Sequence, residues 1–246
     1  MTGEGWTQAV RRQLGLGRVL PLGGAADGAW VTESAVDGAL RRMAERVPGV
    51  RLGPVRIAPA APGEASVAAV PSPPSALPPG PLRIVAEFSA VAGDPLPAAA
   101  DRLRAALSEA ADGLGLVTDG VDLKVTALLD TAEEGGEDGR SRPHTPPAEQ
   151  PAEQSTEQAA SDSDEARAER AALAVPGVAW LTGVLGRAVH IEQRPATGSL
   201  PRRHARVELA TDHGHRALDV ALAVRAAVGT ALPDHPSVAV LVTDVR

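Results

Sequence analysis

The chain has 246 residues, of which 43% are hydrophobic, and it carries a net charge of −7. It contains no cysteine, which excludes disulfides, thiol nucleophiles, iron–sulfur clusters and cysteine-based zinc sites, and which fits a reducing cytoplasm. Aromatic residues make up only 2% of the chain, so its cores must be built from Val, Leu, Ile and Ala.

The first segment, residues 1–28, begins with an amphipathic pattern. Trp6, Val10 and Leu14 recur on one side of a potential helix, with two arginines on the other. We expect this apolar side to dock on the rest of the protein; the alternative is a surface for a partner or a membrane interface. No apolar core follows the arginines, so the segment is not typical of a secretory signal.

No part of the sequence predicts a membrane-spanning helix. Such a helix needs about 20 apolar residues, and Asp219 and Arg225 interrupt even the richest apolar run. We therefore expect a cytoplasmic protein.

Residues 29–130 are predicted to form one small α+β unit in the order strand, helix, strand, strand, helix, strand. Trp30 and Val31 are its first strand, and Thr32 is placed to cap a helix whose apolar residues recur up to Val47. Because each element has one apolar face, the simplest arrangement packs both helices on one face of a small sheet. The remaining predicted elements are strands at 55–57 and 82–91, a helix at 96–110 and a strand at 121–129.

Two segments are predicted to lie outside packed structure. In residues 59–81, five prolines between positions 71 and 79 favour an extended, polyproline-like spacer loop. Residues 131–164 have almost no large apolar side chain, so we expect a disordered acidic linker. From Thr131 to Glu165, ten acidic residues against two arginines give a net charge of −8, which leaves the rest of the chain near neutral. A recognition role for either segment is the alternative.

Residues 165–246 are predicted to form a second α+β unit. Val-Pro-Gly-Val occurs at 47–50 and again at 175–178, each time after a predicted helix. The elements expected here are a helix at 166–174, strands at 187–193 and 204–211, a helix at 216–232 and a strand at 238–244, without an evident opening strand.

An ungapped offset of 121 residues indicates that the second unit is a divergent copy of the first. It places Phe88 on Leu209 and Arg104 on Arg225. The two-residue alternation keeps its phase, and a slip of one residue would turn every strand side chain to the other face. The final strands also match, with Val121 corresponding to Val238.

These motifs resemble the alkaline-shock, envelope-stress-response family of bacteria, over about residues 29–129 and 166–245. The likeness lies in the helix ending in Val-Pro-Gly-Val, the helix after a Gly-containing turn and the last Val-x-Leu/Val-x-Val-Thr strand. It implies a small non-enzymatic domain that acts by protein–protein association, often at the inner side of the membrane through a partner that spans it. The Pro-rich insertion, the acidic linker and the tandem arrangement depart from that family. The whole chain also resembles uncharacterised proteins of high-GC bacteria labelled nucleopolyhedrovirus p-ten family, a label from which we infer no function.

One group of residues is a candidate for metal chemistry. Asp212, His213 and His215 lie in a strand-to-helix turn, with His204 on the preceding strand, and two imidazoles with a carboxylate suit zinc. We expect a polar turn instead, because the matching turn at 92–94 has no histidine. Phosphate-binding, nucleophile-elbow and metalloprotease motifs do not occur, so we predict no catalytic residue and no cofactor.

The predicted function is a non-enzymatic interaction or scaffold protein with a protein partner, which would hold it at the membrane periphery if that partner is membrane-associated. Trp180, matched to Leu52 of the first copy, is expected to pack in the core or at an edge; the alternative is partner binding. RNA binding is a second hypothesis, against which stand the near-neutral folded part and the scarcity of aromatic residues. A small hydrolase or metal-binding protein using the histidine-rich turn is the third.

Overall fold

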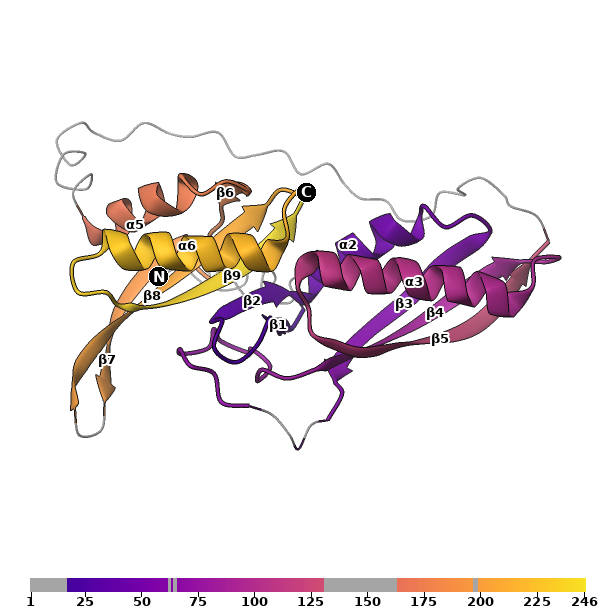
Figure 1. The fold of residues 1–246 in the computed structure, drawn as a ribbon, viewed down its shortest axis with the longest axis horizontal. Coiled ribbons are helices and arrows are strands. Elements are labelled where there is room, and N and C mark those ends of the chain that lie inside the picture. Colours follow the sequence, from indigo (N-terminus) through magenta and orange to yellow (C-terminus); the bar gives the residue numbers. More distant parts are fainter. Residues whose placement is uncertain (1–16, 62, 64–65, 131–162, 197–198) are drawn as a thin grey trace, which may run out of the picture.

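The computed structural model describes residues 17–61, 63, 66–130, 163–196 and 199–246 (Figure 1). Within them the protein is α+β, as predicted, with four helices and two mixed sheets. The segment with Trp6, Val10 and Leu14 lies outside the described residues, as do residues 131–162 of the acidic linker. None of the described helices is long and apolar enough to cross a membrane.

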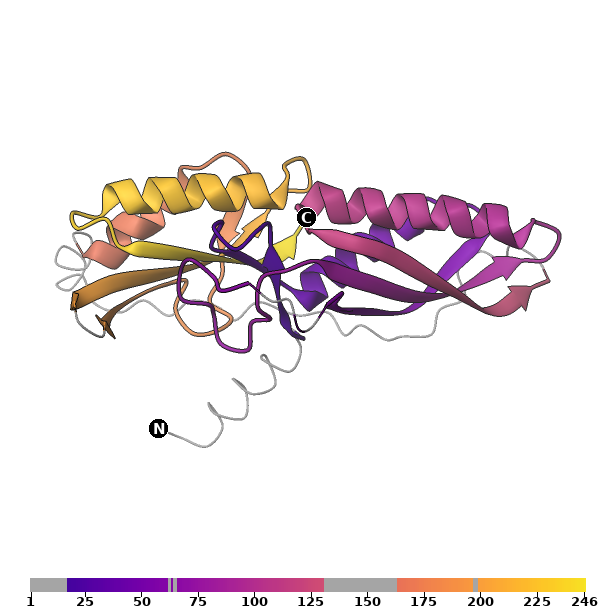
Figure 2. The same ribbon diagram turned by 60° about the horizontal axis from the view of Figure 1, so that its bottom comes forward.

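The first half of the chain builds the three-stranded sheet B. Its strands lie in the order β3-β4-β5, with β3 antiparallel to β4 and β5 parallel to it. Helices α2 and α3 lie on one face of this sheet (Figure 2). The elements are α2 (Glu33–Ala44), β3 (Val50–Pro59), β4 (Leu82–Val91), α3 (Leu96–Leu114) and β5 (Thr118–Leu129).

The second half builds most of the six-stranded sheet A, in the order β1-β2-β9-β8-β6 with β7 also paired to β8. Its own elements run helix, strand, strand, strand, helix, strand, and both β6 and β7 pair with the same edge of β8. They are α5 (Asp164–Leu173), β6 (Val178–Leu181), β7 (Val189–Ala196), β8 (Ser199–Thr211), α6 (Ala217–Ala231) and β9 (Ser237–Val245).

The strand pairing places the residues matched by sequence at the same sheet positions. Ile84 pairs with Val121 across β4 and β5, and Ala205 pairs with Val238 across β8 and β9. Each ladder shifts register at the same point, after Phe88 in β4 and after Leu209 in β8.

The residue at each of these bulges is a threonine with the same hydrogen bond. Thr126 Oγ1 donates to the carbonyl oxygen of Phe88 at 3.3 Å, and Thr243 Oγ1 donates to that of Leu209 at 3.2 Å. The side-chain bond satisfies a carbonyl at the point where the bulge disrupts the regular ladder.

The prediction that Trp30 and Val31 open the first unit's sheet is wrong. They belong to β2 (Ala29–Thr32), which pairs in parallel with β9 of sheet A and in antiparallel with β1 (Val19–Leu22). The chain crosses from sheet A to the first half at Thr32, whose hydroxyl accepts the N–H of Ala35 at 3.3 Å and caps α2 as predicted. The β1–β2 hairpin thus extends the sheet of the other half.

The Pro-rich segment is also not the free spacer that its composition predicts. Residues 66–81 cross the outer face of sheet A, the face away from the helices (Figure 2). Val70 is buried there with Val19, Trp30, Ala239 and Leu241. Backbone bonds to the hairpin hold the segment in place, so it serves as a cover for this apolar face.

The two halves pack end to end and share one hydrophobic core (Figure 1). The α3 helix ends at Gly115, whose carbonyl oxygen accepts the N–H of Gly23 at 3.0 Å. Arg216, before α6, donates to the carbonyl oxygen of Asp112 at 3.1 Å. These contacts fix the halves relative to each other.

Candidate functional site

The structure does not bring the four predicted metal ligands together. His204 lies on β8, with its Nδ1 2.8 Å from Ser237 Oγ, and burial lowers the pKa of its imidazole, with the charge of Arg194 acting in the same direction. The turn with Asp212, His213 and His215 begins eight residues further on, roughly 25 Å along an extended strand. In the described part of the chain, no three His, Cys, Asp or Glu side chains are placed to hold a metal ion.

Trp180 lies on β6 and is 37% exposed, with the guanidinium of Arg246 4.9 Å from its ring centroid. Its match to Leu52 is wrong by one residue. Leu52 pairs with Phe88, and the residue that pairs with Leu209 at the corresponding place is Leu181. The register shift between Val178 and Trp180 turns the tryptophan toward the surface.

The clearest difference between the two sheets is the free edge of β5. Among the described strands, β5 has a neighbour on its β4 side alone, whereas β9 lies between β8 and β2. Val125 and Leu128 of β5 are 39% and 59% exposed. Val242 and Val245, at the same positions of β9, are 0% and 5% exposed. Aliphatic side chains that are buried in sheet A are therefore open to solvent in sheet B.

The cover over β9 consists of β2 and α2, which follow one another in the chain. Val31 of β2 pairs with Val242, and the N–H of Val240 donates to the carbonyl oxygen of Gly28 at 3.0 Å. Beyond the strand, Arg42 of α2 donates to the carbonyl oxygen of Val245 at 2.8 Å. A strand and the helix after it thus close the edge of sheet A.

One arginine occupies the same position on both long helices but has different partners. Arg225 of α6 donates to the carbonyl oxygens of Ala26 and Asp27, at 2.7 and 2.8 Å, and so holds the turn that leads into β2. Arg104 of α3 instead donates to the carbonyl oxygen of Val121 on β5, the edge strand of sheet B, at 3.3 Å. Arg104 also donates to the carboxylate of Asp101 on its own helix, at 2.6 Å.

The outer faces of the two sheets differ in polarity. On sheet B, Arg83 lies 3.0 Å from Asp122, and Lys124 lies 3.3 Å from Glu87. On sheet A, the positions of Asp122 and Lys124 are taken by Ala239 and Leu241, which are fully buried under the Pro-rich cover. Cross-strand ion pairs suit a face that meets water, so the outer face of sheet B needs no cover.

Glu208 is the buried exception on the outer face of sheet A. Its carboxylate accepts the N–H groups of Val184 and Leu185, at 2.7 and 3.0 Å, and lies 3.2 Å from Arg206. Burial raises the pKa of this carboxyl, while the three donors oppose the rise. These bonds hold the 182–188 loop on the sheet, so we assign this carboxylate a structural role.

Comparisons with known proteins leave the chain without an assigned family. No family model matches it, and no curated protein matches it. A search of solved structures found a double variant of MamM-CTD, which is 17% identical, with 38% of this chain and 90% of that chain covered and a TM-score of 0.25. The resemblance to the alkaline-shock family therefore stays a prediction.

The residues at the free edge were not singled out from the sequence, because strand patterns report which faces of a strand are covered and not which of its edges is free. Residues 238–242 form an unbroken apolar run, which is typical of a strand buried on both faces. Residues 121–125 alternate Val, Asp, Leu, Lys and Val, which is typical of a strand with one face in water. Comparing these two patterns would have indicated that the outer face of β9 is covered and that the outer face of β5 meets water.

Proposed function

We propose that this protein is a non-enzymatic adaptor that binds a partner protein by adding a strand of the partner to the free edge of β5. The observation that carries the proposal is the contrast between matching positions. Val125 and Leu128 are 39% and 59% exposed, while Val242 and Val245 are buried beneath β2 and α2. Exposed strand edges with aliphatic side chains are the surfaces that strand addition uses.

The proposal includes a common origin for the two halves, as divergent copies of one domain. The matched registers and the threonine bonds at both bulges support it. Support also comes from the corner before each long helix, where the N–H of Val91 donates to the Gly49 carbonyl and that of Asp212 to the Gly177 carbonyl. If the halves are copies, the closed edge of β9 is a template for what the open edge of β5 receives.

The template defines the chemistry of the partner. The segment would run parallel to β5, as β2 runs parallel to β9, with aliphatic side chains on the helix side next to Leu123 and Val125. On the other face it would carry polar side chains, because Asp122 and Lys124 line that face. A helix after the strand would cover Leu128, and Arg104 would donate to carbonyl oxygens before the strand, as Arg225 does in sheet A.

A synthetic peptide of residues 17–46 with Trp30→Thr is a suitable probe for titration into the full chain by isothermal calorimetry. It is the chain's own strand-and-helix segment with a polar side chain in place of the outer-face tryptophan. We expect saturable binding that Val125→Glu and Leu128→Glu each weaken at least tenfold, equivalent to about 1.4 kcal/mol. The matched control is Val85→Glu, which changes a valine that is 40% exposed on the outer face of the same sheet. Equal binding to all three variants, or no binding to the unaltered chain, would overturn the proposal.

A further inference from the structure

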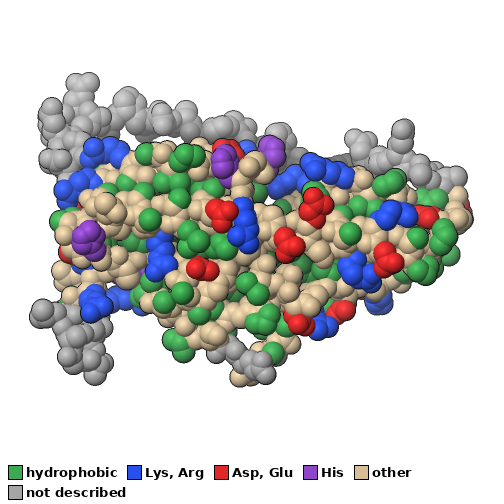
Figure 3. Space-filling model, in the orientation of Figure 1, with side chains coloured by type: hydrophobic (Ala, Val, Ile, Leu, Met, Phe, Trp, Pro, Cys, Tyr) green, Lys and Arg blue, Asp and Glu red, His purple; other side chains and the backbone are tan. Residues whose placement is uncertain are grey.

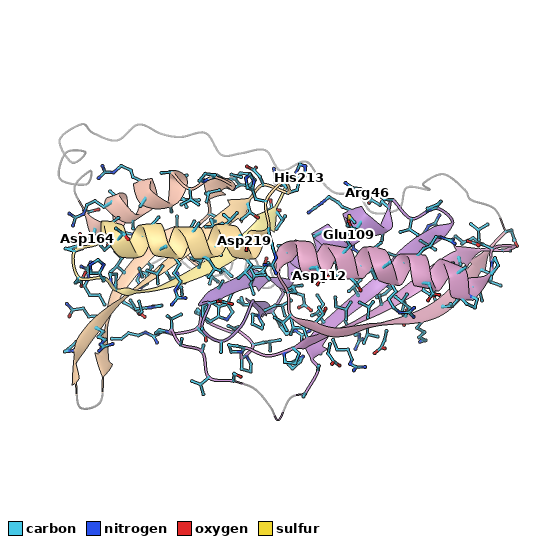
Figure 4. The ribbon with its side chains drawn as sticks, viewed as in Figure 1. Arg46, Glu109, Asp112, Asp164, His213 and Asp219 are labelled. Atoms are coloured by element: carbon cyan, nitrogen blue, oxygen red, sulfur yellow. The ribbon has the colours of Figure 1, made fainter. Side chains whose placement is uncertain are left out.

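A cavity of about 610 Å³ lies at the junction of the two halves. Its walls come from α2 and the last turns of α3 on one side, and from the turn before α6 and the end of β9 on the other. Figure 4 shows Arg46, Glu109 and His213 around this region. The apolar part of the lining consists of Ala39, Met43, Ala110, Leu114 and Val245.

The polar part of the lining is mostly basic. It contains three arginines and two histidines but one carboxylate. Figure 3 shows basic side chains gathered beside histidines near the middle of the molecule. Of the arginines, Arg246 is paired with Asp244 at 2.8 Å. The polar lining residues are Arg42, Arg46, Glu109, His213, His215 and Arg246.

Arg42 and Arg46 form no ion pair with any described residue. Arg42 donates one hydrogen bond, to the carbonyl oxygen of Val245, and Arg46 contacts Met43 Sδ at 3.6 Å. A guanidinium has five N–H donors, so most of the N–H donors of both side chains are available to bind a ligand. Two positive charges without an ion-pair partner among the described residues, one in the last turn of α2 and one in the turn after the helix, thus border an aliphatic floor.

The combination selects one class of ligand. The volume falls within the range of about 300 to 1,000 Å³ that is usual for small-molecule sites. Guanidinium groups bind carboxylate and phosphate through paired hydrogen bonds, and the aliphatic floor favours a hydrocarbon portion. We propose that the junction cavity binds an amphipathic anion, an aliphatic chain that ends in a carboxylate or a phosphate.

The site is independent of the free edge of β5, and a bound ligand would touch both halves of the protein. Arg46 and Leu114 belong to the first half, and His213 and Val245 to the second. Ligand binding would therefore raise the free energy of unfolding of the protein, by an amount that depends on the ligand concentration and affinity.

The test is calorimetry on the full chain with decanoate and decyl phosphate, each below its micelle concentration. We expect saturable binding of at least one of them, and the tighter one identifies the head group. Decylammonium, with the charge reversed, and acetate, without the chain, should both bind at least tenfold more weakly. Equal binding of decylammonium or of acetate, or no binding of either decyl anion, would overturn the proposal.

Variants locate the binding within the cavity. Arg46→Gln should weaken binding of the decyl anion at least fivefold, and Arg42→Gln with Arg46→Gln should weaken it further, with circular dichroism confirming that the fold is kept. Arg56→Gln, at an exposed arginine of β3 outside the cavity, is the matched control and should bind as the unaltered chain does. Val125→Glu should also leave it unchanged, which separates this proposal from that for β5. Unchanged affinity in the double variant would contradict the site.

Discussion

Arg225 donates a hydrogen bond to the carbonyl oxygen of Asp27 at 2.8 Å and so ties α6 to the turn of the β1–β2 hairpin. The two residues are 198 positions apart in the chain, and the bond joins the second half to a segment that precedes the first. This relationship distinguishes the closed edge of sheet A from the open edge of sheet B.

Replacing Arg225 with Gln should destabilise the protein by about 1.5 to 3 kcal/mol, because two carbonyl oxygens lose a charged donor. Chemical denaturation measures this change. Arg104→Gln is the matched control, and it should cost less than about 1 kcal/mol, because that guanidinium bonds one carbonyl oxygen of β5 and a neighbouring carboxylate on its own helix. Equal losses in the two variants would contradict the different roles of these arginines.

Gly115 should be intolerant of a side chain. Its φ of +92° is strained for other residues, and a Cβ built there would lie 2.4 Å from the Cβ of Leu218 on α6. We expect Gly115→Ala to lower the free energy of unfolding by about 2 to 4 kcal/mol. Gly229→Ala, in α6 with open space around its Cβ, should be neutral or slightly stabilising. A tolerated Gly115→Ala would mean that the halves do not pack as described.

The Pro-rich cover can be tested with two valines from one segment. Val70 is 6% exposed against Trp30, whereas Val67 is 91% exposed. Val70→Asp should cost roughly 2 to 4 kcal/mol, because it removes buried aliphatic surface and puts a charge against Trp30. Val67→Asp should stay within about 0.5 kcal/mol of the unaltered chain in the same denaturation experiment. Similar small effects at both positions would restore the spacer interpretation.

Glu208 should make stability fall as the pH rises. Its carboxyl has a raised pKa in the folded state, so between the ordinary value of 4.5 and the folded value the native protein binds more protons than the unfolded chain. Stability from this group is therefore greatest below about pH 4.5 and declines through that window. Denaturation of Glu208→Gln across the same pH range should show a weaker decline, whereas Glu87→Gln should keep it. An unaltered pH dependence in Glu208→Gln would contradict this assignment.

The sequence predicted which strand residues face the helices, because a period of two and an apolar phase determine this. Ile84 and Ala205 are both buried on that face, as their matched phase predicts. The pairing of β4 with β5 and of β8 with β9 was not predicted, because the phase of a strand does not say which strand lies beside it. The partner of Trp30 did not follow, because a four-residue strand carries no information about which sheet it joins. Its placement depends on the apolar outer face of β9, which Trp30 covers and which no local pattern connects to residue 30.

Pro-rich composition was similarly misleading for residues 66–81. The prolines favour an extended spacer, but such a composition does not exclude packing, and the segment also contains a turn in which the N–H of Ala76 donates to the carbonyl oxygen of Pro73. A few aliphatic residues such as Val70, placed against Ala239 and Leu241, are enough to hold it. The free edge of β5 was missed for the complementary reason, since exposure of Val125 and Leu128 depends on a neighbour that sheet B lacks.

Amide hydrogen exchange of the full chain, with and without the Trp30→Thr peptide of residues 17–46, tests most directly whether β5 receives a partner strand. Strand addition at β5 predicts slowed exchange at Leu123 and Val125, because Val240, which matches Leu123, donates its N–H to Gly28 in sheet A. The opposite edge of sheet B, at β3, should exchange at an unchanged rate. Protection confined to β3, or no protection in sheet B at a saturating peptide concentration, would contradict the proposal that β5 receives a partner strand.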